Sequence, residues 1–178
     1  MRRQNLFITT LGMLFWLVVA PGTQAGWDPD RTAAAKQAVA EFKKADPSIQ
    51  RFFDTAHAYA VFPTVGKGGL WIGGAHGKGL VFQDDKVVGD TSLTQLTIGL
   101  QLGGQVYREI IFFRDAATFD RFKGGNFELS AQASAVAATL GASADADFSG
   151  GVAVFTLAKG GLMYEASVGG QKFDYTPR

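Results

Sequence analysis

The sequence of 178 residues has no cysteine, 17 lysines and arginines against 16 aspartates and glutamates, and 23 glycines. This composition excludes disulfide bonds, a cysteine-linked lipid anchor and the broad basic field by which proteins attract nucleic acid. The length suits one domain with its own hydrophobic core, and the glycines predict many turns, bulges or close backbone contacts.

The first 25 residues have the pattern of a secretory signal peptide. Arg2 and Arg3 precede an apolar run from Leu6 to Ala20, and small residues end the pattern at Ala25. The run is shorter than the roughly 20 residues that a bilayer-spanning helix needs, which favours cleavage over an uncleaved anchor. We therefore expect an exported protein, periplasmic or associated with the envelope, whose single domain covers residues 26–178.

Two helices are predicted at the start of the mature chain. Residues 31–45 repeat apolar side chains at the helical period, and Asp46 and Pro47 are typical of the start of a second helix. The apolar face of the first helix consists of Ala35, Ala38, Val39 and Phe42. The apolar face of the second consists of Ile49, Phe52, Phe53 and Ala56.

From residue 59 onward the apolar residues recur at a period of two, and glycines interrupt the pattern, as in a sheet of short strands. In the run 93–102 we expect Leu96, Ile98 and Leu100 to point into a buried face, with Gln95 on the other side. Glycine-rich stretches are expected to form turns between strands, with special backbone geometry at Gly68, Gly69, Gly73 and Gly74. The predicted strands are residues 59–65, 70–75, 79–83, 86–88, 93–102, 105–113, 152–157, 162–168 and, at an edge, 171–178.

Two further helices are predicted between these strands. Asp115 can cap a short helix that Gly124 and Gly125 end, and Asn126 can cap a longer one that extends to Leu140. Together these elements predict an α+β fold: a mostly antiparallel, strongly curled or barrel-like sheet of about seven strands with two N-terminal helices and two inserted helices.

Residue types that carry catalysis or bind metals are scarce. The chain has two histidines, His57 and His76, in separate segments, and no thiol, so the ligand clusters of zinc sites are missing. The stretch from Gly73 to Gly79 has neither the spacing nor the serine or threonine of a phosphate-binding loop, and no nucleophile elbow is present. We therefore expect no enzyme, no cofactor and no metal site.

Four glycine-rich segments, in order along the mature chain, resemble the SYLF domain family. They are residues 56–69 (AHAYAVFPTVGKGG), 98–105 (IGLQLGGQ), 122–129 (FKGGNFEL) and 154–160 (VFTLAKG), and the resemblance covers about residues 31–173. Residues 161–165 depart from the small, glycine-containing sequence of many relatives.

The resemblance implies lipid binding. Eukaryotic SYLF members bind phosphoinositides and some bind actin, while bacterial members are exported or lipid-anchored proteins described as lipid-binding. We therefore expect a non-catalytic protein that associates with anionic lipid or membrane surfaces. Actin is not expected as a partner, because a bacterial envelope offers no obvious counterpart, and neither is nucleic acid.

The first helix offers a lipid-binding site by its charge and amphipathic pattern. Lys36, Lys43 and Lys44, extended by Arg51, can contact phosphate groups while Phe42 inserts among the headgroups. The same apolar stripe can instead dock the helix on the sheet and leave the lysines in solvent.

Two other functions remain open at this stage. One is an envelope protein that binds a protein partner through a sheet edge or an apolar groove. The other is a carrier that encloses an acyl chain in a cavity lined by Leu96, Ile98 and Leu100.

Overall fold

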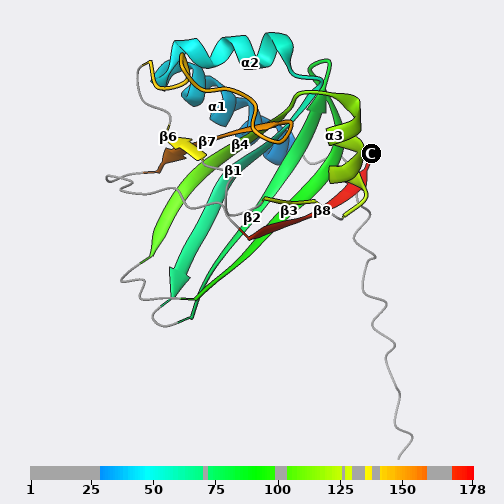
Figure 1. Cartoon of the computed structure of the whole chain (residues 1–178). Helices are drawn as coiled ribbons and strands as arrows, with labels where there is room; N and C mark the ends of the chain where they lie inside the picture. Colours follow the sequence, from blue (N-terminus) through cyan, green and yellow to red (C-terminus); the bar gives the residue numbers. More distant parts are fainter. Residues whose placement is uncertain are drawn as a thin grey trace, which may run out of the picture.

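The computed structural model describes residues 29–69, 72–98, 104–125, 127–129, 135–137, 141–159 and 170–178 (Figure 1). Its helices are α1 (Pro29–Ala45), the 3-10 helix η1 (Pro47–Ile49), α2 (Gln50–Thr55) and α3 (Ala116–Lys123). Its strands are β1 (Ala58–Gly69), β2 (Ile72–Gln83), β3 (Lys86–Ile98), β4 (Gln105–Phe113), β5 (Glu128–Leu129), β6 (Ala135–Ala137), β7 (Val152–Ala158) and β8 (Gln171–Pro177). The predicted α+β class is confirmed.

The strands form one sheet in the order β5-β8-β3-β2-β1-β4-β7-β6. Six long strands, from β8 to β7, pair antiparallel, and the short β5 and β6 extend the two sides. Within the described residues the two end strands do not pair with each other, so the sheet is open. The expectation of a barrel-like, strongly curled sheet of about seven strands is wrong, because helices and packed side chains cover the two faces without closure.

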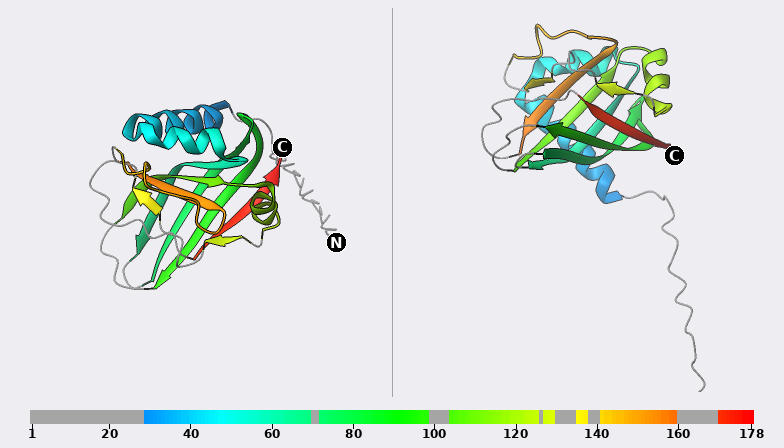
Figure 2. Two further views of the ribbon diagram at one scale, coloured as in Figure 1. Left: turned by 45° about the horizontal axis from the view of Figure 1, so that its top comes forward. Right: turned by 60° about the horizontal axis from the view of Figure 1, so that its bottom comes forward.

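Each face of the sheet carries its own hydrophobic cluster. Tyr59 and Val61 of β1 point to the face that α1 and α2 cover, which we call the outer face (Figure 2). Ala60 and Phe62 point to the opposite face, which we call the inner face. The strict alternation of side chains along a strand produces this division, and it lets one strand stabilise two cores.

Helix α1 docks on the outer face through its predicted apolar stripe. Ala35, Ala38 and Phe42 are buried. Arg31 forms an ion pair of 2.8 Å with Asp90 of β3, and Glu41 forms one of 2.6 Å with Arg108 of β4. The helix therefore crosses the intervening strands β2 and β1.

The corner after α1 is held by a buried aspartate. Asp46 caps η1, as predicted, by accepting a hydrogen bond from the Ser48 backbone nitrogen. Its carboxylate also accepts from the backbone nitrogens of Gly141 (3.1 Å) and Ser143 (2.7 Å). Burial alone would raise the pKa of Asp46, but the hydrogen bonds outweigh it and lower the pKa to about 2.

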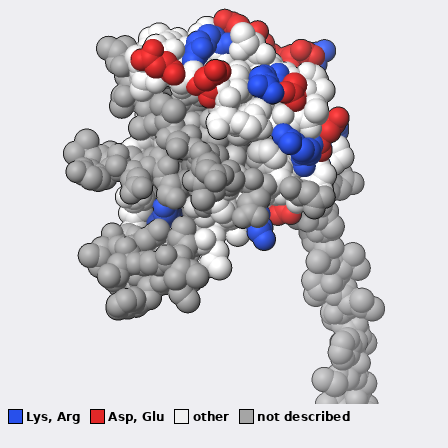
Figure 3. All heavy atoms as spheres, viewed as in Figure 1, with Lys and Arg blue, Asp and Glu red and all other residues white. Residues whose placement is uncertain are grey.

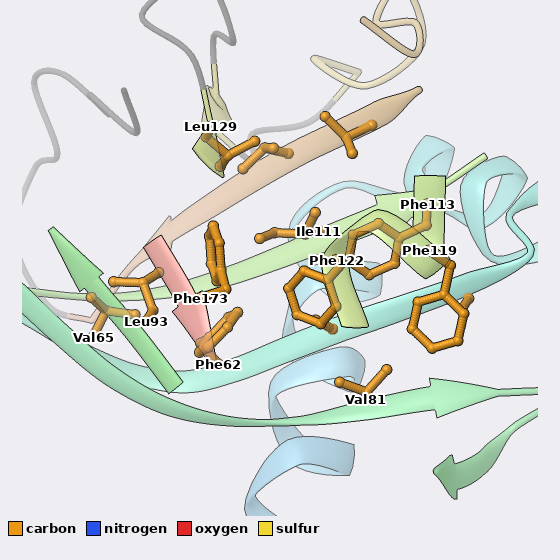
Figure 4. Packing of buried hydrophobic residues seen from close by; sticks show 14 of the residues in the cluster. Phe62, Val65, Val81, Leu93, Ile111, Phe113, Phe119, Phe122, Leu129 and Phe173 are labelled. Atoms are coloured by element: carbon orange, nitrogen blue, oxygen red, sulfur yellow. The ribbon is translucent and has the colours of Figure 1, made fainter. Parts of the chain in front are cut away.

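The inner face is filled by aromatic side chains (Figure 4). Phe119 and Phe122 of α3 lie against Phe113, with ring centroids 5.5 and 4.7 Å apart, and Phe122 also contacts Phe173 of β8. The predicted caps of α3 are confirmed, since the Asp115 carboxylate accepts from the Thr118 nitrogen at 2.8 Å. Helix α3 thus closes one end of the inner core.

Two of the glycine-rich stretches that were predicted as turns lie inside strands. Residues 66–69 continue β1 and residues 77–79 continue β2. A Cβ atom on Gly79 would lie 2.5 Å from the Val61 carbonyl oxygen, so glycine permits the close approach of β1 and β2 at a bulge after Val61. Gly68 has open space around it and no left-handed φ, so its expected special geometry is not found.

The turn between β2 and β3 uses aspartates. Asp84 and Asp85 have φ angles of 49° and 58°, as a two-residue hairpin of type I′ requires. The sequence prediction placed a break here correctly. It was wrong to divide residues 70–83 and 86–102 further, because each hairpin arm is one continuous strand over its described residues.

Strand β3 presents the opposite face from the one predicted. Gln95 is 2 % exposed and Leu96 is 70 % exposed. Leu93 packs in the inner cluster, and a period of two then sends residue 95 inward and residue 96 outward. Leu93 and Leu96 differ in parity and so point to opposite faces, and Leu96 is exposed on the outer face while Leu93 is buried on the inner face.

The second inserted helix is also wrong where the structure describes it. Residues 128–129 form β5 on β8, and residues 135–137 form β6 on β7. Both segments pair with the backbone N–H and C=O groups of the outer strands of the sheet. This tertiary pairing overrides the local preference for a helix. The rest of that segment, the predicted strand 162–168 and the signal peptide lie outside the described residues. No helix in the described ranges is long and apolar enough to cross a bilayer.

Candidate functional site

Helix α1 leaves one end of the outer face uncovered. Its ion pairs to Asp90 and Arg108 mark where it crosses the sheet, and β1, β2 and β3 run on past it toward the bottom of Figure 1. We call this uncovered area the distal outer face. It consists of Gly66, Gly68, Gly74, His76, Lys78, Thr94, Leu96, Val106, Lys159 and Lys172.

Strand pairing arranges these residues in transverse rows. One row runs from Val106 through Gly66, His76 and Thr94 to Lys172. In the next row Gly68 and Gly74 pair with each other, and Gly74 also pairs with Leu96. Residues that are far apart in the sequence therefore form one continuous surface.

Apolar side chains project from this surface. Leu96 is 70 % exposed and Val106 is 45 % exposed. No atom lies within 4 Å of where a Cβ would stand on Gly66 or Gly68, so the glycines between them leave the surface flat and open. Leu96 on β3 and Val106 on β4 are separated by β2 and β1, so they are two exposed apolar positions on one flat surface.

Three lysines lie on the same face as the two apolar residues. Lys78 and Lys172 are exposed on β2 and β8, and the Lys159 ammonium donates a 2.8 Å hydrogen bond to the Thr64 hydroxyl of β1. The acidic residue at the border, Asp174, accepts a hydrogen bond from Ser92. The distal outer face therefore carries three lysines together with two exposed apolar side chains.

A shallow polar pocket of about 190 Å³ adjoins the distal outer face and shares Lys78 with it. Its wall includes Asp90, which is bound by Arg31 and by Arg178. The hydrogen bond from Arg178 is the main reason that the pKa of Asp90 lies below its ordinary value. The full lining is Arg31, Lys78, Asp90, Thr91, Ser92, Asp174 and Thr176.

The structure corrects one of the five predicted lipid-binding residues. Phe42 is fully buried between α1 and the sheet, so it cannot insert into a membrane while the helix stays docked. The alternative interpretation, in which the apolar stripe docks the helix on the sheet, describes its position.

The four basic residues of the predicted site lie apart from the distal outer face. Lys36 and Lys44 are exposed, the Lys43 ammonium lies 4.3 Å over the Phe53 ring, and Arg51 donates to the Ser143 carbonyl oxygen. Acidic and basic side chains are intermixed over the helices at the top of Figure 3. These residues stay a hypothesis, but the structure does not assemble them around an exposed apolar centre.

Sequence reasoning missed the distal outer face because it assigned β3 to the wrong parity. The prediction counted Leu96 as a core residue and so did not find it on the surface. Because Leu96 is in fact exposed, it also cannot line the carrier cavity that was proposed. The two histidines lie apart: His57 contacts the Gln83 amide at 3.1 Å, and His76 is exposed on β2. Within the described residues no three histidine, cysteine or carboxylate side chains group together as metal ligands.

Residues 94–176 match a family model described as "Ysc84: Las17-binding protein actin regulator". The chain is also similar to "Beta cell expansion factor A" from Aeromonas veronii, with 31% identity over 129 residues. That similarity covers 71% of this chain and 49% of the relative, so the chain spans about half the length of the curated relative it matches.

Proposed function

Because this chain is a member of the SYLF (Ysc84) family, in which lipid- or actin-related binding is expected, we propose that it binds anionic lipid surfaces through the distal outer face. The observation that supports this most is that Leu96 and Val106 are exposed on the same face as three lysines. Aliphatic side chains can enter the headgroup region while ammonium groups meet lipid phosphates.

The expected affinity is weak. Each lysine near an anionic surface contributes on the order of 1 kcal/mol. Partial burial of Leu96 adds about 1 kcal/mol, less than the 1.5–3 kcal/mol of full burial. A sum of about 4 kcal/mol corresponds to a dissociation constant near 1 mM, so binding is reversible and depends on salt.

The test is co-sedimentation of the mature protein with phosphatidylglycerol and phosphatidylcholine vesicles at 50 and 500 mM NaCl. We compare two variants that remove the same charge. One replaces Lys78, Lys159 and Lys172 by glutamine on the distal outer face. The other replaces Lys36, Lys43 and Lys44 by glutamine on α1. The first should weaken binding by about a hundredfold, since three lysines contribute about 3 kcal/mol, and the second should change it little.

Each other outcome has a definite meaning. Loss of binding in the α1 variant alone would move the site to α1. A wild-type protein that sediments with no vesicle, even at 50 mM NaCl, would end the lipid proposal and favour a protein partner. Leu96→Ser separates the apolar contribution, because it should weaken binding without changing the charge.

The proposed function includes export. The pattern of residues 1–25 supports cleavage after Ala25, which would place the mature domain at the periplasmic or envelope side of a membrane. The intact mass of protein recovered from an envelope fraction should correspond to a chain that begins at Gly26. Recovery of the full chain as an integral membrane protein would contradict this.

A further inference from the structure

Four polar side chains are buried together on the inner face, away from the distal outer face. Tyr107 and Glu109 come from β4, Thr156 from β7 and Gln171 from β8, and we call them the inner polar cluster. Tyr107 is 3 % exposed and the other three are fully buried. A group of this kind among the Phe, Val and Leu side chains of the inner core needs a physical explanation.

Strand register and one hydrogen bond bring these residues together. Glu109 pairs directly with Thr156 on the neighbouring strand, and Tyr107 is two residues along β4 on the same face. The Gln171 amide nitrogen donates to Glu109 Oε2 at 3.0 Å, which links β8 to β4 over the strands between them. Thr156 therefore lies opposite Glu109, Gln171 contacts Glu109, and Tyr107 is the neighbour of Glu109 on the same face of β4.

Among the residues that the structure describes, each member of the inner polar cluster has one oxygen without a hydrogen-bond partner. These atoms are Tyr107 Oη, Glu109 Oε1, Thr156 Oγ1 and Gln171 Oε1. Burial raises the pKa of the Tyr107 phenol, with a further rise from Glu109, so Tyr107 offers a neutral hydroxyl. The Gln171 side chain lies near the Tyr107 hydroxyl and offsets part of the rise in its pKa. Among the described residues, however, no partner meets the geometry of a hydrogen bond with that hydroxyl.

The chemistry of these atoms defines the ligand that they fit. All four are oxygens, the donor type that hard cations prefer. Once Glu109 is ionised, one of the four oxygens belongs to a carboxylate and three are neutral, so a single positive charge balances the site, whereas a divalent ion would leave a net buried charge. We propose that the inner polar cluster binds one compact monovalent cation, sodium or potassium.

The test is a cation titration of the mature protein followed by thermal unfolding. The protein is exchanged into tetramethylammonium chloride, whose cation is too large for the site, and NaCl or KCl replaces it at constant total chloride. The experiment runs at pH 9, because burial raises the pKa of Glu109 to about 8 and a bound proton would compete with the cation. The Tyr107 phenol stays neutral at pH 9, because burial raises its pKa. Lys67 of β1 also lies on the inner face, and its effect is tested separately below.

We expect a saturable rise in Tm with sodium or potassium, of about 5 °C or more when the cation exceeds its dissociation constant a hundredfold. Glu109→Gln should abolish the rise, because a neutral amide no longer attracts the ion. Thr156→Val should reduce it and Thr156→Ser, which keeps the oxygen, should restore it. Asp145→Asn, which removes an exposed carboxylate, should respond like the wild type.

Three results would overturn the proposal. Equal Tm values in all three chlorides would show that water or a proton satisfies the oxygens. An undiminished rise in both Glu109→Gln and Thr156→Val would place the cation elsewhere. A selective rise that appears only in Lys67→Gln would show that the Lys67 ammonium fills the cluster in the wild type. If Glu109→Gln does not fold, the two Thr156 variants decide the question. None of these readouts involves lipid.

Discussion

Replacing Gly79 by alanine tests the close approach of β1 and β2 that the fold requires. The added methyl carbon would lie 2.5 Å from the Val61 carbonyl oxygen and 2.8 Å from Phe62 Cδ1. The first of these atoms is backbone, so a side-chain rotation cannot relieve the clash. Gly68→Ala in the same strand pair is the matched control, because no atom lies within 4 Å of its added carbon.

The magnitude follows from the two contacts. Overpacking in a filled core costs about 1–3 kcal/mol, and separating the strands to relieve it weakens a ladder hydrogen bond worth about 1 kcal/mol. For a chain of this size the resulting 2–4 kcal/mol lowers Tm by roughly 4–16 °C. Gly68→Ala should change the free energy of unfolding by no more than about 0.5 kcal/mol.

Urea denaturation followed by far-ultraviolet circular dichroism measures both variants, and thermal scans give the change in Tm. A reduced midpoint with an unchanged slope would mean that Gly79→Ala acts on stability alone. Equal midpoints for Gly79→Ala and Gly68→Ala would refute the reasoning, because the two sites differ only in what surrounds the added carbon.

Three other expected outcomes concern the cores and their buried carboxyls. Phe42→Ser should lower the free energy of unfolding by about 3–5 kcal/mol while the folded protein keeps its vesicle binding; lost binding at unchanged stability would return Phe42 to the lipid site. The ionised Asp46 carboxylate contributes stability that is fully present above its ordinary pKa of 3.8 and is lost as pH falls toward about 2. Asp46→Asn should therefore be less stable than the wild type at pH 7 and should not show this loss at low pH. Urea titrations at several pH values measure both effects. Burial raises the pKa of Glu109 from 4.5 to about 8 in the folded state, so between these pH values the native state keeps a proton that the unfolded state releases. In tetramethylammonium buffer the free energy of unfolding should therefore fall as pH rises from 4.5 to 8. A difference in stability between the wild type and Glu109→Gln that does not depend on pH would contradict this.

The local signals in the sequence were sufficient for α1, the η1–α2 segment and α3, but not for the helix predicted after Asn126, which is wrong over its described residues. The 3.6-residue stripe that includes Phe42 docks α1, Asp46 caps η1 and Asp115 caps α3, because each of these effects acts within a few residues. The break at Asp84 and Asp85 was found for the same reason. The ordered glycine motifs also indicated the family to which the chain belongs.

The candidate site could not be predicted because it depends on strand parity. A leucine at 93 and another at 96 are equally apolar, and only the packing of Leu93 against the inner core decides that Leu96 points outward. The lysines of the distal outer face come from β2, from β8 and from the residue after β7, so only strand register brings them together.

The same distinction applies to the glycines and to the inner polar cluster. Gly68 and Gly79 are identical residues in similar sequence contexts, yet one faces open space and the other lies against the Val61 carbonyl oxygen. Glu109 and Gln171 are 62 positions apart and meet only because β8 lies where its side chain can reach β4. The sequence by itself determined elements whose causes are local, namely α1, the η1–α2 segment and α3, the caps at Asp46 and Asp115, and the hairpin turn. The tertiary structure alone decided which face each strand residue presents and which distant residues meet, because those depend on packing between segments that no local pattern encodes.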